Sequence, residues 1–323
     1  MAAGDFRHVA IIGTGLIGAS LGLAIREASP GVRITGFELG SDAQRTASRL
    51  KAVDSFAPSL PHAVRDADLV VVATPVRSIE LVFREMRDDL PPGVLVSDTA
   101  STKADVLRWA AELLPAGTSF VGGHPMTGRL TGGSGDPVGT LFQQTVFCIV
   151  PSATAEASLV QRFVNLTEGI GAVPYFVDAA EHDGLVAGIS HLPYIASVML
   201  MRCIAEDRSW REMRSLASGG FATATQLAAG NPTMYADICL TNREPILRQL
   251  DQYIERLREL RHRIDDGDET ILEEFTEASL ARDAWLNAPA DPDTLPASAD
   301  LRGPNIFSPG KLGDLVRGRR KDS

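Results

Sequence analysis

The stretch His8–Ile25, HVAIIGTGLIGASLGLAI, decides the fold. It begins with an apolar, β-branched run typical of a buried strand, and three glycines in a G-x-G-x-x-G frame separate that run from an apolar helical segment. In this setting Gly13 permits a tight turn, Gly15 lets a pyrophosphate approach the backbone, and Gly18 lets the helix pack closely on the strand. The stretch therefore predicts a strand, a turn and a helix whose N-terminus binds a dinucleotide.

An acidic residue, Glu38, ends the second predicted strand in ITGFE. Its carboxylate is expected to accept hydrogen bonds from the ribose hydroxyls of an adenosine and to repel a 2′-phosphate, which favours NAD over NADP. Arg45 lies close enough in the sequence to leave the choice between the two cofactors open. A later strand, LVVVATP, ends at Pro75 and borders the same cleft. The predicted cofactor-binding residues are Gly13, Gly15, Leu16, Ile17, Gly18, Glu38, Thr74 and Pro75.

Short strand-like segments alternate with amphipathic or alanine-rich segments from residue 7 to about residue 177. This alternation predicts a parallel sheet flanked by helices. After Asp178 the strand pattern disappears and long helical patterns follow, one of them over residues 231–264 around CLTN. We therefore predict an α/β fold with an N-terminal Rossmann-type domain over residues 1–177, an all-helical C-terminal domain over 178–286, and an extended tail over 287–323.

The composition is that of a soluble globular protein. The chain has 323 residues, 44% of them hydrophobic, and its formal net charge of −10 argues against a nucleic-acid partner. The N-terminus lacks the pattern of a secretory signal, and no later apolar run approaches the roughly 18 residues of a membrane span. Cys148, Cys203 and Cys239 are scattered, which fits free thiols in a reducing cytoplasm better than disulfides or a zinc site. We predict a cytoplasmic protein without a metal site or a membrane partner.

A histidine, His124, stands in FVGGHPMTG directly after a predicted strand. Ligands of open α/β sheets bind beyond the carboxyl ends of the strands, and the segments that carry Ser101 and His124 both end there. Pro125 favours an extended conformation, and Gly122 and Gly123 keep bulk away from the imidazole, so we expect it to lie in the cleft. A neutral histidine there can act as general base on an alcohol that surrenders a hydride, with Ser101 bonded to the same hydroxyl. The alternative is a histidine that only caps a loop.

Two further histidines, His182 and His191, lie in the helical pattern HDGLVAGISHLPY. They are nine residues apart, about 180° around an α-helix, so a continuous helix cannot turn both toward one cleft. Pro193 is expected to kink the helix near His191 and to turn that side chain into a cavity. We therefore assign the functional role to His191 and a structural role to His182.

The motifs GTGLIGASLG, SDTASTK, GGHPMTG, EHDGLVAGISHLPY and NPTMYADICLTN occur in this order, and the chain resembles the prephenate and arogenate dehydrogenases of tyrosine biosynthesis from about residue 8 to residue 285. The resemblance implies a Rossmann-type NAD-binding domain, a helical dimerisation domain that forms a homodimer, and oxidative decarboxylation of a cyclohexadienyl substrate. It also implies that His124 accepts the proton of the ring C4 hydroxyl while a hydride passes to NAD, that Ser101 orients this hydroxyl, and that His191 lines the substrate pocket.

The chain departs from this family where a substrate carboxylate is bound. The family motif GGFRDTTR ends in an arginine, whereas this chain reads GGFATATQ, and Gln226 offers an amide without positive charge. Arg129, Arg243 or an arginine of a second copy are the candidates to replace that charge. Thr223 stands where the family has an acidic residue that would suit the ammonium of arogenate, so prephenate is favoured. Tyr194 and Tyr235 replace a histidine and a tryptophan. The predicted substrate-binding residues are Gln226, Arg129, Thr223, Tyr235 and Arg243.

Several other functions compete with this assignment. Arogenate and a modified cyclohexadienyl acid such as 4-amino-4-deoxyprephenate stay open as substrates. A β-hydroxyacid dehydrogenase would use a lysine of its helical domain, but the chain has none between Lys103 and Lys311. A sugar-nucleotide dehydrogenase would need a nucleophilic cysteine, and Cys239 has no basic neighbour in the sequence. A non-catalytic NAD-binding sensor remains open because the family arginine is missing. We expect no tyrosine-sensing domain in the tail.

Overall fold

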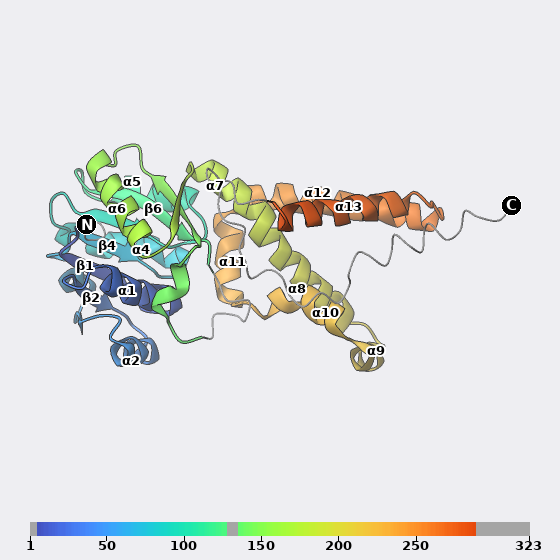
Figure 1. Cartoon of the computed structure of the whole chain (residues 1–323), viewed down its shortest axis with the longest axis horizontal. Coiled ribbons are helices and arrows are strands. Elements are labelled where there is room, and N and C mark those ends of the chain that lie inside the picture. Colours follow the sequence, from blue (N-terminus) through green and yellow to red (C-terminus); the bar gives the residue numbers. More distant parts are fainter. Residues whose placement is uncertain (1–4, 128–134, 289–323) are drawn as a thin grey trace. The chain divides into compact units, whose positions relative to one another are not determined.

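The structure is a computed structural model and describes residues 5–127 and 135–288. The chain consists of two compact units, Met1–Gly267 and Asp268–Ser323. The first holds the sheet and the helices through α12 (Arg243–Asp265), and the described part of the second holds α13 (Ile271–Leu286). Figure 1 follows the elements along the chain, from β1 in blue to α12 in orange. Of the predicted tail, residues 289–323 lie outside the described residues.

A single eight-stranded sheet forms the N-terminal part in the order β3-β2-β1-β4-β5-β6-β7-β8. Its first six strands have the order of a Rossmann fold, with the topological switch point between β1 and β4. The predicted α/β fold with a Rossmann-type domain is confirmed. The strands are β1 (His8–Ile12), β2 (Arg33–Phe37), β3 (Ser55–Phe56), β4 (Leu69–Val72), β5 (Leu95–Asp98), β6 (Ser119–Pro125), β7 (Val146–Pro151) and β8 (Val173–Phe176).

The sheet is mainly parallel, as predicted, and departs from this arrangement at one pairing. Strand β7 runs antiparallel to β6, while every other pair of neighbours is parallel. Pro125 at the end of β6 pairs with Phe147 near the start of β7, so β7 begins at the same end of the sheet at which β6 finishes. A parallel pairing would need a connection that returns to the opposite end of the strands. The short edge strand β3 was not predicted either.

The strands alternate their side chains between two apolar layers. In β1, Val9 and Ile11 face one layer, and Ala10 and Ile12 face the other. Helices α1 and α6 complete the first layer, and α3, α4 and α5 complete the second. The helices of this part are α1 (Leu16–Ala28), α2 (Ser41–Leu50), α3 (Leu60–Val64), α4 (Ile79–Met86), α5 (Ala104–Leu113) and α6 (Ala157–Gly169). The sheet is thus covered on both faces, as parallel strands require.

Every described element after β8 is helical, as predicted. The predicted limits at residues 177 and 286 stay predictions; β8 ends at Phe176 and α7 begins at Ala179. The long helix predicted around CLTN is divided at Asn242, where α11 ends and α12 begins. These elements are α7 (Ala179–Val186), a π-helical segment (Ala187–His191), α8 (Leu192–Ala205), α9 (Trp210–Leu216), α10 (Gly219–Ala224), η5 (Gln226–Ala229), α11 (Pro232–Thr241) and α12.

The expectation that no apolar run reaches membrane length does not hold. Helix α7, the π-helical segment and α8 form one continuous helix, Ala179–Ala205, which by length and composition alone could cross a membrane. This is weak evidence for a span, because His182, Asp183 and His191 within the helix are buried and hydrogen-bonded to other parts of the chain. The helix therefore belongs to the packing around a polar site.

Candidate active site

The glycine motif forms the predicted turn between β1 and α1. Gly13 has a φ of +91°, and a Cβ atom added there would lie 2.6 Å from the carbonyl oxygen of Ala73 after β4. A Cβ atom at Gly18 would lie 1.9 Å from the carbonyl oxygen of Gly13, whereas one at Gly15 would meet only open space. Gly13 therefore permits a left-handed turn, Gly15 leaves the backbone open, and Gly18 permits the close approach of the helix, as expected from the sequence.

A pocket of about 380 Å³ opens beside this turn. Part of its wall comes from residues 135–137, which precede β7, and the sequence did not predict this contribution. The lining residues are Thr14, Gly15, Leu16, Asp42, Ala43, Thr46, Gly135, Asp136 and Pro137. Of the other predicted cofactor residues, Ile17 packs partly on the core, and Pro75 is exposed and precedes a 3-10 turn. The Thr74 hydroxyl is buried and has no partner within the described residues.

Glu38 joins the turn through its carboxylate. Its two oxygens accept hydrogen bonds from the backbone N–H of Thr14 at 2.7 Å and of Gly40 at 2.8 Å. Arg45, which left the choice of cofactor open, forms an ion pair with Asp42 at the pocket wall. The acidic side chain is therefore fixed at the turn, and Arg45 is already paired.

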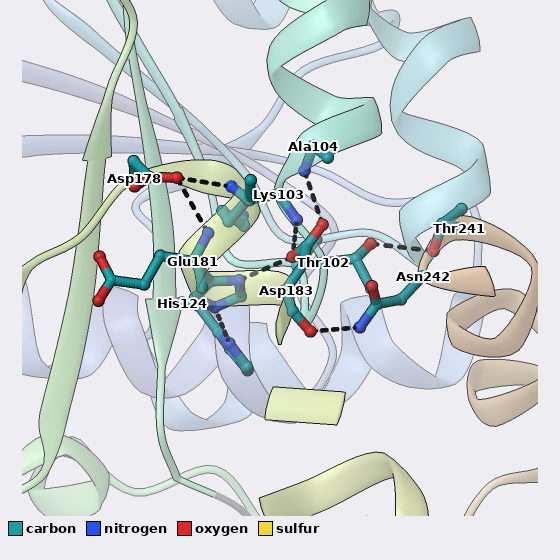
Figure 2. Close-up of polar contacts among 12 residues, drawn as sticks. Thr102, Lys103, Ala104, His124, Asp178, Glu181, Asp183, Thr241 and Asn242 are labelled. Atoms are coloured by element: carbon teal, nitrogen blue, oxygen red, sulfur yellow. Dashed lines mark hydrogen bonds and ion pairs between the residues drawn. The ribbon is translucent and has the colours of Figure 1, made fainter. Parts of the chain in front are cut away.

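His124 lies in β6 opposite Cys148 of β7 and is 9% exposed. Its Nδ1 atom is 2.9 Å from Nε2 of His182, and Nδ1 of His182 is 2.8 Å from a carboxylate oxygen of Asp183 (Figure 2). An ionised carboxylate only accepts hydrogen bonds, so Nδ1 of His182 donates to Asp183. If both rings are neutral, Nε2 of His182 accepts from Nδ1 of His124, and Nε2 of His124 keeps a free lone pair.

Asp183 also holds the start of α5. Its two oxygens accept hydrogen bonds from the backbone N–H of Lys103 at 2.8 Å and of Ala104 at 2.9 Å. These are orphan donors at a helix N-terminus, where a negative charge is favoured. A second contact nearby joins the hydroxyls of Thr102 and Thr241 at 2.9 Å. The helical region is thus tied to the sheet region at the point where His124 is held (Figure 2).

A fully buried ion pair, Lys103 with Asp98, supports the strand that carries His124. The ammonium of Lys103 also donates to the carbonyl oxygen of Gly123 at 2.7 Å, and the N–H of Gly123 donates to Asp98 at 3.2 Å. A Cβ atom at Gly123 would lie 2.5 Å from the carbonyl oxygen of Asp98, and one at Gly122 would lie 3.1 Å from the Lys103 side chain. The two glycines therefore leave room for the backbone of β5 and for the Lys103 side chain, whereas the sequence interpretation assigned that room to the imidazole.

Burial keeps the imidazoles of His124 and His191 uncharged. Desolvation is the main cause that holds the pKa of His124 well below 6.5, and any positive charge on His182, Lys103 or His191 acts in the same direction. Burial likewise lowers the pKa of His191 to about 4, although Asp183 opposes the shift. Both rings are therefore neutral at physiological pH, so His124 is available as a proton acceptor.

The argument that only one of His182 and His191 can reach the site is wrong. His182 contacts His124 directly, and His191 lies close enough to lower the pKa of His124 and is bonded to Asn242. The reason is the π-helical segment Ala187–His191, whose wider turns rotate each residue less than an α-helix does. It lies just before Pro193, near the expected kink, and π-helical segments are frequent at functional sites.

Within the described residues, no hydrogen bond or ring contact joins the other predicted residues to the His124 side chain. Ser101 is half-buried after β5, and its hydroxyl has no hydrogen-bond partner in the part of the chain that the structure describes. Thr223 and Gln226 are exposed, as is Arg243 at the start of α12. Tyr235 stacks on Tyr194 with ring centroids 3.3 Å apart. Arg129 lies outside the described residues.

Four residues of the site were not identified from the sequence: Lys103, His182, Asp183 and Asn242. Asp183 had a usable signal, because a carboxylate directly follows a histidine in EHDG. No sequence signal indicated that Lys103 is buried. A lysine is almost never buried unless it is paired, and the partner of Lys103 is brought to it only by tertiary packing.

Two models of known families match the chain. The model described as "Prephenate dehydrogenase, nucleotide-binding domain" matches residues 21–176, and "Prephenate dehydrogenase, dimerization domain" matches residues 178–278. The chain belongs to the prephenate dehydrogenase family. The resemblance drawn from the sequence motifs is confirmed.

Individual members of the prephenate dehydrogenase family agree with this assignment. "Prephenate dehydrogenase" of Bacillus subtilis (strain 168) is 31% identical over 280 residues, 85% of this chain and 75% of that protein. "Cyclohexadienyl dehydrogenase" of Zymomonas mobilis is 32% identical over 281 residues, 86% of this chain and 95% of that protein. The fold is that of A. aeolicus prephenate dehydrogenase, solved with hydroxyphenyl propionate and NAD+, at a TM-score of 0.79 and 22% identity, covering 85% of this chain and 97% of that chain.

Proposed function

We propose that this protein is a cytoplasmic, NAD-dependent dehydrogenase that oxidises and decarboxylates prephenate to 4-hydroxyphenylpyruvate in tyrosine biosynthesis. The observation that carries the proposal is the buried chain Asp183–His182–His124, which leaves Nε2 of a neutral His124 as a free base at the carboxyl end of β6. The similarity to prephenate and cyclohexadienyl dehydrogenases supports this substrate class. The absence of any disulfide among Cys148, Cys203 and Cys239 is compatible with the cytoplasm.

The residues beside β1 and β4 fit a dinucleotide. Gly15 faces open space where a pyrophosphate would approach, and Thr14 and Leu16 line the pocket. The unpartnered, buried Thr74 hydroxyl lies at the switch point and would bond the nicotinamide half of the cofactor. Glu38 would accept hydrogen bonds from the ribose hydroxyls. When bound, NAD supplies the acceptor for the hydride.

His124 would take the proton of the ring C4 hydroxyl through Nε2. Its Nδ1 atom stays hydrogen-bonded to His182, whose other ring nitrogen is hydrogen-bonded to Asp183. Positive charge that develops on His124 is therefore stabilised by the Asp183 carboxylate through these two hydrogen bonds. As the hydride leaves C4, the ring carboxylate departs as carbon dioxide, and its bonding electrons complete the aromatic ring. The proton held by His124 returns to the phenol oxygen. Ser101, which follows the neighbouring strand β5, would orient the substrate hydroxyl.

The substrate carboxylates need a partner other than Gln226. A neutral amide gives a weaker bond to a carboxylate than a guanidinium does. Arg129, Arg243 and an arginine of a second copy remain the proposed sources of charge, and Thr223 and Tyr235 remain proposed substrate contacts. Because Thr223 carries no charge to pair with an ammonium, prephenate is preferred over arogenate.

We further propose that the protein is a homodimer through its helical region. The family model over residues 178–278 is named for dimerisation. Within the first unit, the apolar side chains of Ile189, Leu216 and Leu240 are 71%, 83% and 61% exposed, and a dimer contact in this region would cover them. Light scattering should give twice the chain mass of 34.5 kDa.

The experiment that tests the function is a substrate panel. The purified protein is incubated with NAD and prephenate, arogenate or 4-amino-4-deoxyprephenate, while reduced cofactor and carbon dioxide are measured and the product is identified by mass spectrometry. Turnover of prephenate to 4-hydroxyphenylpyruvate supports the proposal. Preference for another acid changes the substrate, and tight NAD binding without turnover of any of them supports the sensor alternative. In His124→Asn, NAD binding should survive while kcat falls about 10²-fold or more.

A further inference from the structure

Asn242 separates α11 from α12 and is 2% exposed. Asparagine at a helix start normally accepts a hydrogen bond from the backbone N–H groups of the first turn. Here the side chain makes no such bond to α12, and its backbone has a φ of −122° and a ψ of 38°. The side chain is therefore directed to other partners, at the cost of an uncapped helix.

Both hydrogens of the Asn242 amide are used inside the site. The Nδ2 atom lies 2.8 Å from the backbone carbonyl oxygen of Asp183 and 3.1 Å from Nδ1 of His191. A carbonyl oxygen can only accept, so the group that faces it must be the NH₂ and not the amide oxygen. The second hydrogen of the same NH₂ group then points to Nδ1 of His191. Figure 2 shows the bond between Asn242 and Asp183.

These contacts determine where His191 carries its hydrogen. Since Nδ1 accepts from Asn242, the neutral ring bears its hydrogen on Nε2. That Nε2–H group is buried and has no partner in the ranges 5–127 and 135–288, and the same holds for Oδ1 of Asn242. A buried donor without a partner is costly, so its presence points to a ligand that supplies the acceptor.

We propose that Asn242 is a positioning residue that holds His191 as its Nε2–H tautomer, so that His191 donates a hydrogen bond to a carboxylate or ketone oxygen of the substrate. The identity of this oxygen rests on the function proposed above, whereas the tautomer does not. The site then contains two neutral imidazoles with opposite tasks. His124 offers a lone pair for a proton, and His191 offers a hydrogen and cannot compete as a base. If the acceptor is the ketone oxygen, an ammonium group cannot replace it, and the contact then favours a keto acid over an amino acid; a carboxylate acceptor gives no such preference.

The tautomer can be measured without substrate. Chemical shifts of ¹⁵N-labelled histidine distinguish a protonated ring nitrogen from an unprotonated one, and comparison with His191→Gln assigns the signals. For the full-length wild-type protein at neutral pH, we expect Nε2 of His191 to be protonated and Nδ1 to be unprotonated. A hydrogen on Nδ1, or an equal mixture of both tautomers, would overturn the proposal whatever the activity of the protein.

The variant Asn242→Asp tests the consequence for the substrate. A carboxylate at this position accepts from Nδ1–H of His191 instead of donating to it, so Nε2 loses its hydrogen. We expect KM for prephenate to rise about tenfold while kcat changes much less, because one hydrogen bond to the bound substrate is lost. The matched control is Asn165→Asp on the exposed face of α6, where the side-chain oxygen accepts from Gln161 at 2.9 Å and an aspartate can do the same.

The outcomes separate this proposal from the proposed function. An unchanged tautomer and an unchanged KM in a folded Asn242→Asp protein would overturn the role of Asn242. A parallel fall of kcat and of thermal stability, with KM unchanged, would also overturn it and show a structural role. If no cyclohexadienyl acid is turned over but wild-type His191 carries its hydrogen on Nε2, the proposed function fails and the positioning role of Asn242 stands.

Discussion

The Nε2 atom of His182 lies 2.9 Å from the Nδ1 atom of His124, so a residue of the helical region is the direct partner of the proposed base. Asp183 faces the other nitrogen of His182 at 2.8 Å and simultaneously accepts from the first backbone N–H groups of α5. The base is therefore oriented only when the helical region is docked on the sheet region. This couples the assembly of the fold to the protonation pattern of the site.

Replacing Asp183 by asparagine tests the direction of this hydrogen-bond chain. The Asp183 carboxylate accepts hydrogen bonds from three donors, which belong to His182, Lys103 and Ala104. The asparagine amide has the same shape, but its NH₂ group cannot accept, so at least one of these hydrogen bonds is lost. If the amide donates to His182, the hydrogen of His124 moves to Nε2 and the base is blocked. We expect Asp183→Asn to lower kcat about 10²-fold while NAD affinity is retained.

The control for that variant is Asp178→Asn. Asp178 caps α7 by accepting from the N–H groups of Ala180 and Glu181, and asparagine caps a helix equally well. Its kcat should equal that of the wild type. Equal kcat in both variants would show that Asp183 does not act on His124.

The sequence alone predicted those features that depend on local periodicity. The turn at Gly13, the alternation that builds the sheet, and the position of His124 at the carboxyl end of a strand all follow from residue spacing. The roles of His182 and His191 did not follow, because the spacing argument assumed 100° per residue throughout. The π-helical segment Ala187–His191 breaks that assumption, and it has no signature in the hydrophobic pattern.

A second group of features depended on packing between distant segments. The direction of β7 is set by the edge at which the chain re-enters the sheet, and the burial of Lys103 is set by Asp98 and Gly123 together. Both depend on a partner that single-sequence patterns do not contain. The break at Asn242 differs, because the segment TNREP holds an asparagine and a proline, which are local signals of a helix boundary, and the prediction of one long helix passed over them.

Substituting Lys103 tests whether the buried ion pair holds the His124 strand. In Lys103→Met the carboxylate of Asp98 stays buried without its counter-charge, which typically costs about 3–5 kcal/mol of unfolding free energy. We expect the urea midpoint to fall strongly, and to recover in part in the double variant with Asp98→Asn, which removes the unpaired charge. The exposed Lys51→Met should leave the midpoint unchanged. A small effect of Lys103→Met would show that water or relaxation compensates for the lost ammonium.

The pH dependence of activity should report the low pKa of His124. A base works in its unprotonated form, so a pKa held below 6.5 by burial moves the loss of activity to more acidic pH. We expect kcat/KM for prephenate to stay level from about pH 8 to about pH 6.5 and to fall only below that range. Circular dichroism at each pH separates protonation of the base from unfolding. The exposed His62→Gln variant should give the same profile, and an acid limb centred near the usual histidine pKa would contradict the buried, neutral base.

Cofactor choice should depend on two aspartates in the pocket wall in addition to Glu38. Asp42 is paired with Arg45, and Asp136 lies 3.3 Å from Arg49. Both arginines lie on α2 and would attract the 2′-phosphate of NADP if they were free, while both carboxylates repel it.

The double variant Asp42→Asn with Asp136→Asn tests this dependence on cofactor charge. Because the pairs are exposed and worth little individually, we expect the kcat/KM ratio of NADP to NAD to rise by only about tenfold. The rise should shrink at high salt, since exposed charges are screened. The matched control is Asp105→Asn, which removes a carboxylate paired with Arg108 on α5 and should leave the ratio unchanged. If the ratio stays constant in the double variant, Glu38 alone discriminates against the 2′-phosphate.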